Sequence, residues 1–172
     1  AGGSVDKAKE QAEAILNLDR YQGCMAYVAV YEYEKKIDKV EQYCQKAISA
    51  NPQKWEPYHR LGYVYLSQKR YDESIAQFSK MVECNPEDPN SYDSLGDGYW
   101  ADNKVDEALA NYAKAVSINP SFSPSVFNLA QCYEKKNKKD EALQQYKNFL
   151  ALVKKGAQAD KARARIRDLE DK

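Results

Sequence analysis

Few residues in this sequence could carry metal, redox or acid–base chemistry: the 172 residues include four cysteines and one histidine. No two cysteines form a Cys-x-x-Cys pair, so a zinc site has almost no support. We interpret His59 as an exposed contact residue rather than as a catalytic base. The cysteines, in turn, are interpreted as small buried hydrophobic residues; they are Cys24, Cys44, Cys84 and Cys132.

A disulfide between two of these cysteines is an alternative interpretation. Cys24 and Cys44 are expected on the two facing helices of one hairpin, where they could pair. Such a pair would imply an oxidising compartment.

The motifs of the common enzyme classes are also missing. No Gly-x-Ser-x-Gly sequence and no phosphate-binding loop occurs. Gly96-Asp97-Gly98 lies inside an expected helix, whereas a glycine-rich phosphate cradle needs a preceding strand and a following helix. The sequence therefore argues against an enzyme, and we expect no cofactor and no metal site.

Composition excludes further classes of protein. Lys plus Arg (26) equals Asp plus Glu (26), so the broad cationic surface of a non-specific nucleic-acid binder is absent. No apolar run approaches the ~18 residues of a membrane-spanning helix. We expect no nucleic-acid partner, no membrane insertion and a single domain over residues 1–172. The compartment stays open between the cytoplasm and, if an export signal has been removed, the periplasm.

Tyrosine is unusually common, with 14 residues against four Phe and two Trp, and its positions show a repeat. Several columns recur every 34 residues: Tyr31, Tyr65, Tyr99 and Tyr133; Asp38, Asp72, Asp106 and Asp140; and the Asn-Pro pairs at Pro52, Pro86 and Pro120. Apolar residues at helical spacing within that period predict two helices per repeat.

The columns also predict how each helical hairpin is built. The Asp column should start the second helix as its N-cap, and Asn-Pro should end it, because the residue before Pro is pushed out of the α region. Gly62 and Gly96 cost helix propensity, which indicates close approach of an aromatic ring from the second helix. The turn between the two helices requires a left-handed residue; the candidates are Lys35, Lys69, Asn103 and Asn137.

At these positions the sequence resembles the tetratricopeptide repeat family. The third repeat matches the pattern of that family best, with Tyr92, Leu95, Gly96, Tyr99, Ala108, Tyr112, Ala115 and Pro120. The resemblance implies four repeats, at 21–54, 55–88, 89–122 and 123–156. Helices at 5–18 and 157–172 would cap the ends. The implied fold is an all-α, right-handed superhelical solenoid of antiparallel helix pairs, with ten helices.

In the resembled family, ligands usually lie along the concave wall formed by the first helix of each repeat. Carried over to this sequence, the candidate partner-binding residues are His59, Tyr63, Leu66, Asp93, Asp97, Trp100, Phe127, Gln131 and Glu134. Aromatic and apolar side chains among them would anchor a partner. Asp93 and Asp97 would select a cation, so we expect a partner segment with apolar and basic side chains. The Lys and Asn pair with which some family members hold a chaperone's terminal carboxylate is absent.

We therefore predict a non-enzymatic adaptor that binds a partner protein or peptide in its concave groove. The alternative is a homo-oligomeric scaffold, assembled head to tail or through convex-face contacts. Residues 55–122 carry 6 basic and 11 acidic side chains, a net charge of −5. Residues 123–172 carry 12 and 7, a net charge of +5, so the two segments could attract each other between molecules.

Overall fold

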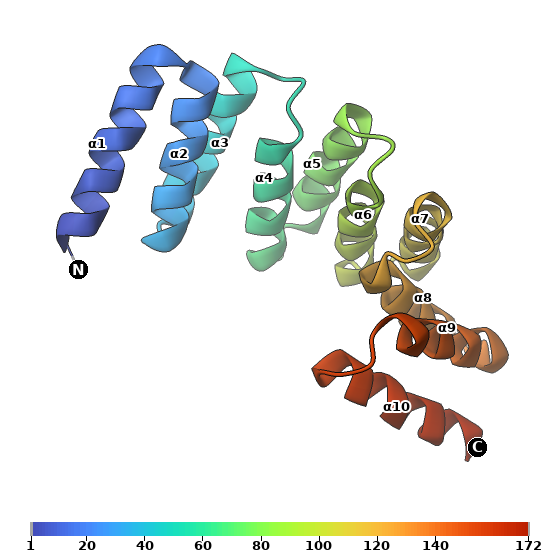
Figure 1. Cartoon of the computed structure of the whole chain (residues 1–172). Coiled ribbons are helices and arrows are strands. Elements are labelled where there is room, and N and C mark those ends of the chain that lie inside the picture. Colours follow the sequence, from blue (N-terminus) through green and yellow to red (C-terminus); the bar gives the residue numbers. More distant parts are fainter. Residues whose placement is uncertain (1, 172) are drawn as a thin grey trace. The chain divides into compact units, whose positions relative to one another are not determined.

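The computed structural model describes residues 2–171, and over that range it consists of ten α-helices and no strand (Figure 1). In chain order the helices are α1 (Gly2–Leu18), α2 (Arg20–Tyr33), α3 (Ile37–Ala50), α4 (Glu56–Ser67), α5 (Tyr71–Cys84), α6 (Pro89–Ala101), α7 (Val105–Ile118), α8 (Ser123–Lys135), α9 (Lys139–Leu152) and α10 (Ala157–Glu170). The all-α fold class predicted from the 34-residue period is confirmed.

The helices fall into two compact units, α1–α5 up to Asn85 and α6–α10 from Pro86 onward. Within each unit every helix packs against the next one along the chain. The hairpins α2–α3 and α4–α5 belong to the first unit, and α6–α7 and α8–α9 to the second (Figure 1). A single domain over 1–172 and the hand of the superhelix remain predictions.

The loops follow the repeat columns. Helices α3, α5 and α7 end at Ala50, Cys84 and Ile118, each directly before an Asn-Pro pair, as predicted. The turn inside each hairpin contains one residue with positive φ, between 57° and 61°. These residues are the four expected ones, Lys35, Lys69, Asn103 and Asn137.

The prediction that the Asp column caps the second helices is wrong. The N-cap positions are occupied by Lys36, Arg70, Lys104 and Lys138, none of which makes a side-chain capping bond. The aspartates lie two residues beyond the N-cap, in the first helical turn, where their charge still suits the positive end of the helix dipole. Side-chain caps occur elsewhere: Asp19 accepts from the Gln22 amide at 3.0 Å, and Asp88 accepts from the Asn90 amide at 2.9 Å.

A glycine-on-aromatic contact closes two of the hairpins. A Cβ built on Gly62 would overlap the ring of Phe78, and one built on Gly96 would overlap the ring of Tyr112. Both rings are buried in the core. The approach inferred from the sequence is therefore confirmed.

The terminal helices cover the ends of the two units. In α10, Ala159 and Ala162 are fully buried in a core cluster, with Ile166 and Leu169 packed against it. In α1, Ala12 is buried and Leu16 packs against a core cluster, whereas Ile15 is 38% exposed.

The four cysteines are free thiols, so Cys24 and Cys44 form no disulfide. Three of them are buried, and Cys84 is half-buried.

Two carboxylates of α6, one of them buried, link this helix to α7 and α8 in the second unit. Asp93 of α6 accepts hydrogen bonds from the Ser125 hydroxyl of α8 at 2.6 Å and from the Asn128 amide at 3.4 Å. One turn along α6, Asp97 accepts from the Tyr112 hydroxyl of α7 at 2.8 Å. Burial raises the pKa of Asp93 to about 6, and the nearby Asp97 carboxylate adds to the rise, while the Ser125 and Asn128 hydrogen bonds oppose it.

Replacing Gly96 by Ala tests the glycine-on-aromatic contact. The methyl group gains helix propensity but overlaps the Tyr112 ring, which has no room to retreat, so we expect a net loss of about 1–2 kcal/mol in unfolding free energy. Urea titration followed by circular dichroism measures it. Gly3→Ala is the control, because a Cβ there meets nothing within 4 Å, and it should not destabilise the protein.

Replacing Asp93 by Asn tests the buried carboxylate. Because the folded pKa lies above the unfolded value of about 3.9, the folded state binds the extra proton. The contribution of Asp93 to stability is thus full below pH 4 and is lost as pH rises through about 6. Relative to the parent, Asp93→Asn should gain about 2–3 kcal/mol in unfolding free energy between pH 4 and pH 7.

Ser125→Ala supplies the matched comparison, because losing the hydroxyl donor disfavours the charged carboxylate and should move the same transition to higher pH. Equal pH dependence in the parent and in Asp93→Asn would contradict this account of Asp93.

Candidate functional site

In the first unit, the predicted partner-binding residues lie on α4. Trp55, His59 and Tyr63 follow one another at a spacing of four, and their rings meet edge to face, with centroids 5.9 and 5.0 Å apart. Tyr63 also contacts the Phe78 ring at 5.0 Å and is 37% exposed. Leu66, one turn further, is half-buried. The structure thus brings His59 and Tyr63 together in an aromatic row that is partly open to solvent.

In the second unit, two of the predicted residues serve the interior. Asp93 is only 7% exposed, and Asp97 is half-buried with its carboxylate bonded to the Tyr112 hydroxyl. A carboxylate that is already desolvated and hydrogen-bonded inside the protein is poorly placed to bind a cation from a partner. The expectation that Asp93 selects a basic side chain is therefore corrected.

Phe127 also departs from the prediction. It is 2% exposed and packs against Tyr146 and Phe149, with ring centroids 5.7 and 5.0 Å apart. Helix α10 supplies the rest of this cluster through Ala159 and Ala162. Since the cap helix covers the position that Phe127 would otherwise expose, Phe127 is a core residue and not an anchor for a partner.

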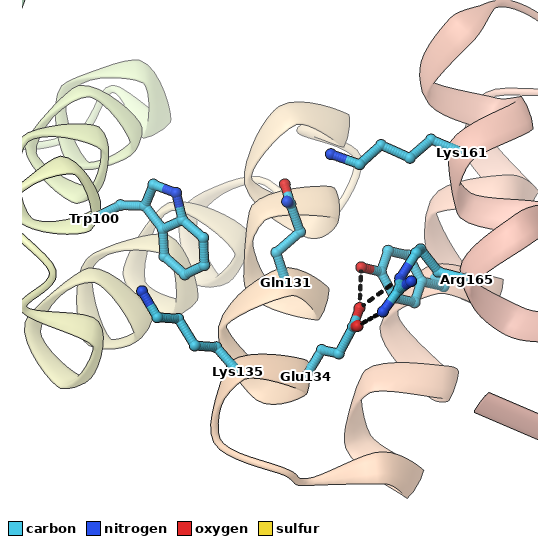
Figure 2. A pocket seen from close by; sticks show the side chains of 7 residues that line it. Trp100, Gln131, Glu134, Lys135, Lys161 and Arg165 are labelled. Atoms are coloured by element: carbon cyan, nitrogen blue, oxygen red, sulfur yellow. Dashed lines mark hydrogen bonds and ion pairs between the residues drawn. The ribbon is translucent and has the colours of Figure 1, made fainter. Parts of the chain in front are cut away.

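The remaining three predicted residues meet at a pocket of about 350 Å³. Trp100 comes from the end of α6, and Gln131 and Glu134 come from α8 (Figure 2). Four residues that the sequence analysis missed complete the lining: Lys135, Tyr146, Lys161 and Arg165. We call this cavity the Trp100 pocket. Its volume lies near the lower end of the range for ligand-binding cavities.

One wall of the Trp100 pocket is fixed by a network around Glu134. Its carboxylate forms an ion pair with Arg165 of α10 and accepts a hydrogen bond from the Tyr146 hydroxyl at 2.9 Å (Figure 2). Arg165 is also paired with Asp168 at 2.9 Å. Burial raises the pKa of Tyr146 to about 12, so its hydroxyl stays protonated as a donor at neutral pH.

Two ammonium groups also line the pocket, one from α8 and one from α10. The Lys135 nitrogen lies 4.8 Å from the centroid of the Trp100 ring, and it also bonds to the Asn103 side chain. The Lys161 nitrogen lies 5.4 Å from the centroid of Phe127 and extends from α10 beside Gln131 (Figure 2). Among the side chains of residues 3–171, neither ammonium has a carboxylate within ion-pair distance.

The missed residues had a weak signal in the sequence. Lys161 and Arg165 are four residues apart and therefore share one face of α10, next to its apolar stripe. Which helix that face meets depends on how the cap helix docks, and the repeat pattern does not specify this.

Two further observations concern metal binding and membrane-spanning helices. In the part of the chain that the structure describes, no group of three or more His, Cys, Asp or Glu side chains is arranged to hold a metal ion. No described helix is both long and apolar enough to cross a membrane.

Comparison with known proteins supports the repeat assignment. Two family models, each described as tetratricopeptide repeat, match residues 43–76 and 99–167, together more than half of the chain. A search of curated protein sequences finds no match.

Solved structures with the same fold include a MamA protein, with 22% identity, 88% of this chain and 90% of that chain covered, and a TM-score of 0.77. YrrB, described as a TPR protein with an unusual peptide-binding site, shows 18% identity, 94% and 84% coverage, and a TM-score of 0.76. PilF of Pseudomonas aeruginosa shows 18% identity, 97% and 82% coverage, and a TM-score of 0.79. At these identities the likeness concerns the fold alone. With the 34-residue period, the helical hairpins and both family models in agreement, the chain belongs to the tetratricopeptide repeat family.

Proposed function

We propose that this protein is a non-enzymatic interaction adaptor that holds a segment of a partner protein at the Trp100 pocket. The observation that carries the proposal is the pocket itself, in which an indole ring of α6 lies beside polar side chains from three further helices. Aromatic anchors that fill or line a pocket are the side chains on which binding energy concentrates. Repeats of this family generally act as interaction modules, which supports the same function.

Of the nine residues predicted from the sequence, Trp100, Gln131 and Glu134 form the core of this proposed site. The aromatic row on α4 is a second proposed contact surface, because Tyr63 keeps 37% of its area exposed. His59 and Leu66 would contribute at its edges. The proposal includes no partner contact from Asp93, Asp97 or Phe127, because these side chains pack or form hydrogen bonds inside the protein.

The experiment is a selection of random twelve-residue peptides, displayed with their C-termini fused to the carrier, on the whole chain. Peptides that bind are then synthesised with a fluorescent label, and affinity is measured by anisotropy. Trp100→Ala should weaken binding by about thirtyfold, the equivalent of ~2 kcal/mol for an anchor residue. Trp100→Phe, which keeps a ring, should lose less.

Tyr33→Ala is the matched control, because Tyr33 is an aromatic residue 75% exposed that does not line the pocket. Thermal unfolding of each variant separates a lost anchor from a lost fold. If every selected peptide binds Trp100→Ala as tightly as the parent, the proposed function is wrong.

A second candidate is self-assembly, favoured by the division of charge within the second unit. Residues 86–122 carry 2 basic and 7 acidic side chains, whereas residues 123–172 carry 12 and 7. Complementary regions of this kind can pair between copies, and screening by salt weakens them. Sedimentation velocity over a wide concentration range should then show association that disappears at high salt; a monomer at low salt would exclude this candidate.

A further inference from the structure

The Trp100 pocket has more positive charge than its own carboxylate neutralises. Three cations line it, Lys135, Lys161 and Arg165, against the single carboxylate of Glu134. The Glu134 carboxylate forms an ion pair with Arg165 and accepts a hydrogen bond from the Tyr146 hydroxyl, so it does not neutralise the two lysines. The ammonium groups of Lys135 and Lys161 are therefore the uncompensated charges of the pocket.

The contacts that these two lysines do make leave their charge available. Each ammonium faces an aromatic ring, Trp100 for Lys135 and Phe127 for Lys161, at 4.8 and 5.4 Å from the ring centroid. A cation–π contact at an exposed site contributes about 0.5–1 kcal/mol and does not neutralise the cation. A ligand carboxylate can add a charge-assisted hydrogen bond to either group without displacing the ring.

The charge that a ligand meets comes from the lining of the pocket itself, because the second unit as a whole is neutral: residues 86–122 carry a net charge of −5 and residues 123–172 a net charge of +5. The Trp100 ring in the lining supplies apolar area next to the ammonium groups. A ligand that satisfies both features combines a carboxylate with an apolar side chain.

We propose that the Trp100 pocket takes an acidic segment of the partner, in which internal Asp or Glu side chains bond to Lys135 and to Lys161 and a neighbouring apolar side chain packs on Trp100. This inference rests on the proposed function and reverses the charge that the sequence alone predicted for the partner. The occupant is a side-chain carboxylate of another protein, neither a free C-terminus nor a second copy of this chain.

The test uses the peptides selected on the whole chain, whose fused C-termini leave only side-chain carboxylates. We expect Trp100-dependent peptides to be enriched in Asp or Glu next to an apolar residue. Lys135→Met and Lys161→Met remove the charge but keep an unbranched side chain over each ring. Each should raise the dissociation constant about tenfold, the size expected for one charge-assisted hydrogen bond.

The matched control is Lys147→Met, because Lys147 is an exposed lysine of α9 that is paired with Glu170 and does not line the pocket. Its affinity should stay within about twofold of the parent, as surface ion pairs contribute little. Replacing a Glu of the peptide by Gln should cost as much as the Met substitution of the lysine that this Glu contacts, and the two losses should not add, since they remove one interaction.

The outcomes separate the inference from the proposed function. Trp100-dependent peptides that are neutral or basic, or that bind both Lys→Met variants normally, overturn the acidic ligand and leave the adaptor function standing. Binding only from a parallel library with free C-termini would instead assign the pocket to a terminal carboxylate, and so also overturns the inference. Self-association abolished by the Lys→Met variants would assign it to a second copy, with the same consequence. Absence of any Trp100-dependent peptide removes the adaptor function itself.

Discussion

The contact on which the hairpins α4–α5 and α6–α7 depend is the one between an aromatic ring of the second helix and a glycine, which has no side chain, of the first. Gly62 receives Phe78 and Gly96 receives Tyr112, so that the ring lies directly against helix backbone. A glycine inside a helix is unfavourable by about 1 kcal/mol relative to alanine, and the buried area of a whole ring exceeds that cost. Because the ring packs against one face of the first helix, the opposite face of that helix takes no part in this contact.

Much of the fold could be predicted because it depends on short-range chemistry that repeats. The Asn-Pro pairs end helices wherever they occur, and the left-handed turn residues are set by the geometry of one hairpin. The N-caps failed for a related reason: the turn is closed by backbone hydrogen bonds, such as that from the Lys36 amide to the Tyr31 carbonyl at 2.9 Å. Because the backbone groups at this turn already have hydrogen-bond partners, the aspartates do not act as caps. They lie in the first helical turn, where their charge interacts with the helix dipole.

The candidate site was predicted less well because exposure is not a property of a repeat column. Phe127 and Trp100 both belong to the face predicted to be open, yet Phe127 is 2% exposed, whereas Trp100 is half-buried and lines a pocket. The difference is made by α10, which covers Phe127 with its alanines. Asp93 likewise is buried by its neighbours, and Ser125, its closest partner, is 32 residues away in the chain. No local pattern marks such a pairing.

The Trp100 pocket follows from the need to close a repeat array. A cap helix must present apolar residues to the last hairpin and polar residues to water. At the boundary between these faces, long charged side chains of α10 contact residues of α8. In α10 those boundary residues are Lys161 and Arg165, and neither belongs to the buried alanine stripe. Substitutions there can change the charge of the pocket with little effect on the core, whereas substitutions at Ala159 or Ala162 would disturb the core itself. The cap thereby separates the residues that determine stability from those that determine which ligand charge is accepted.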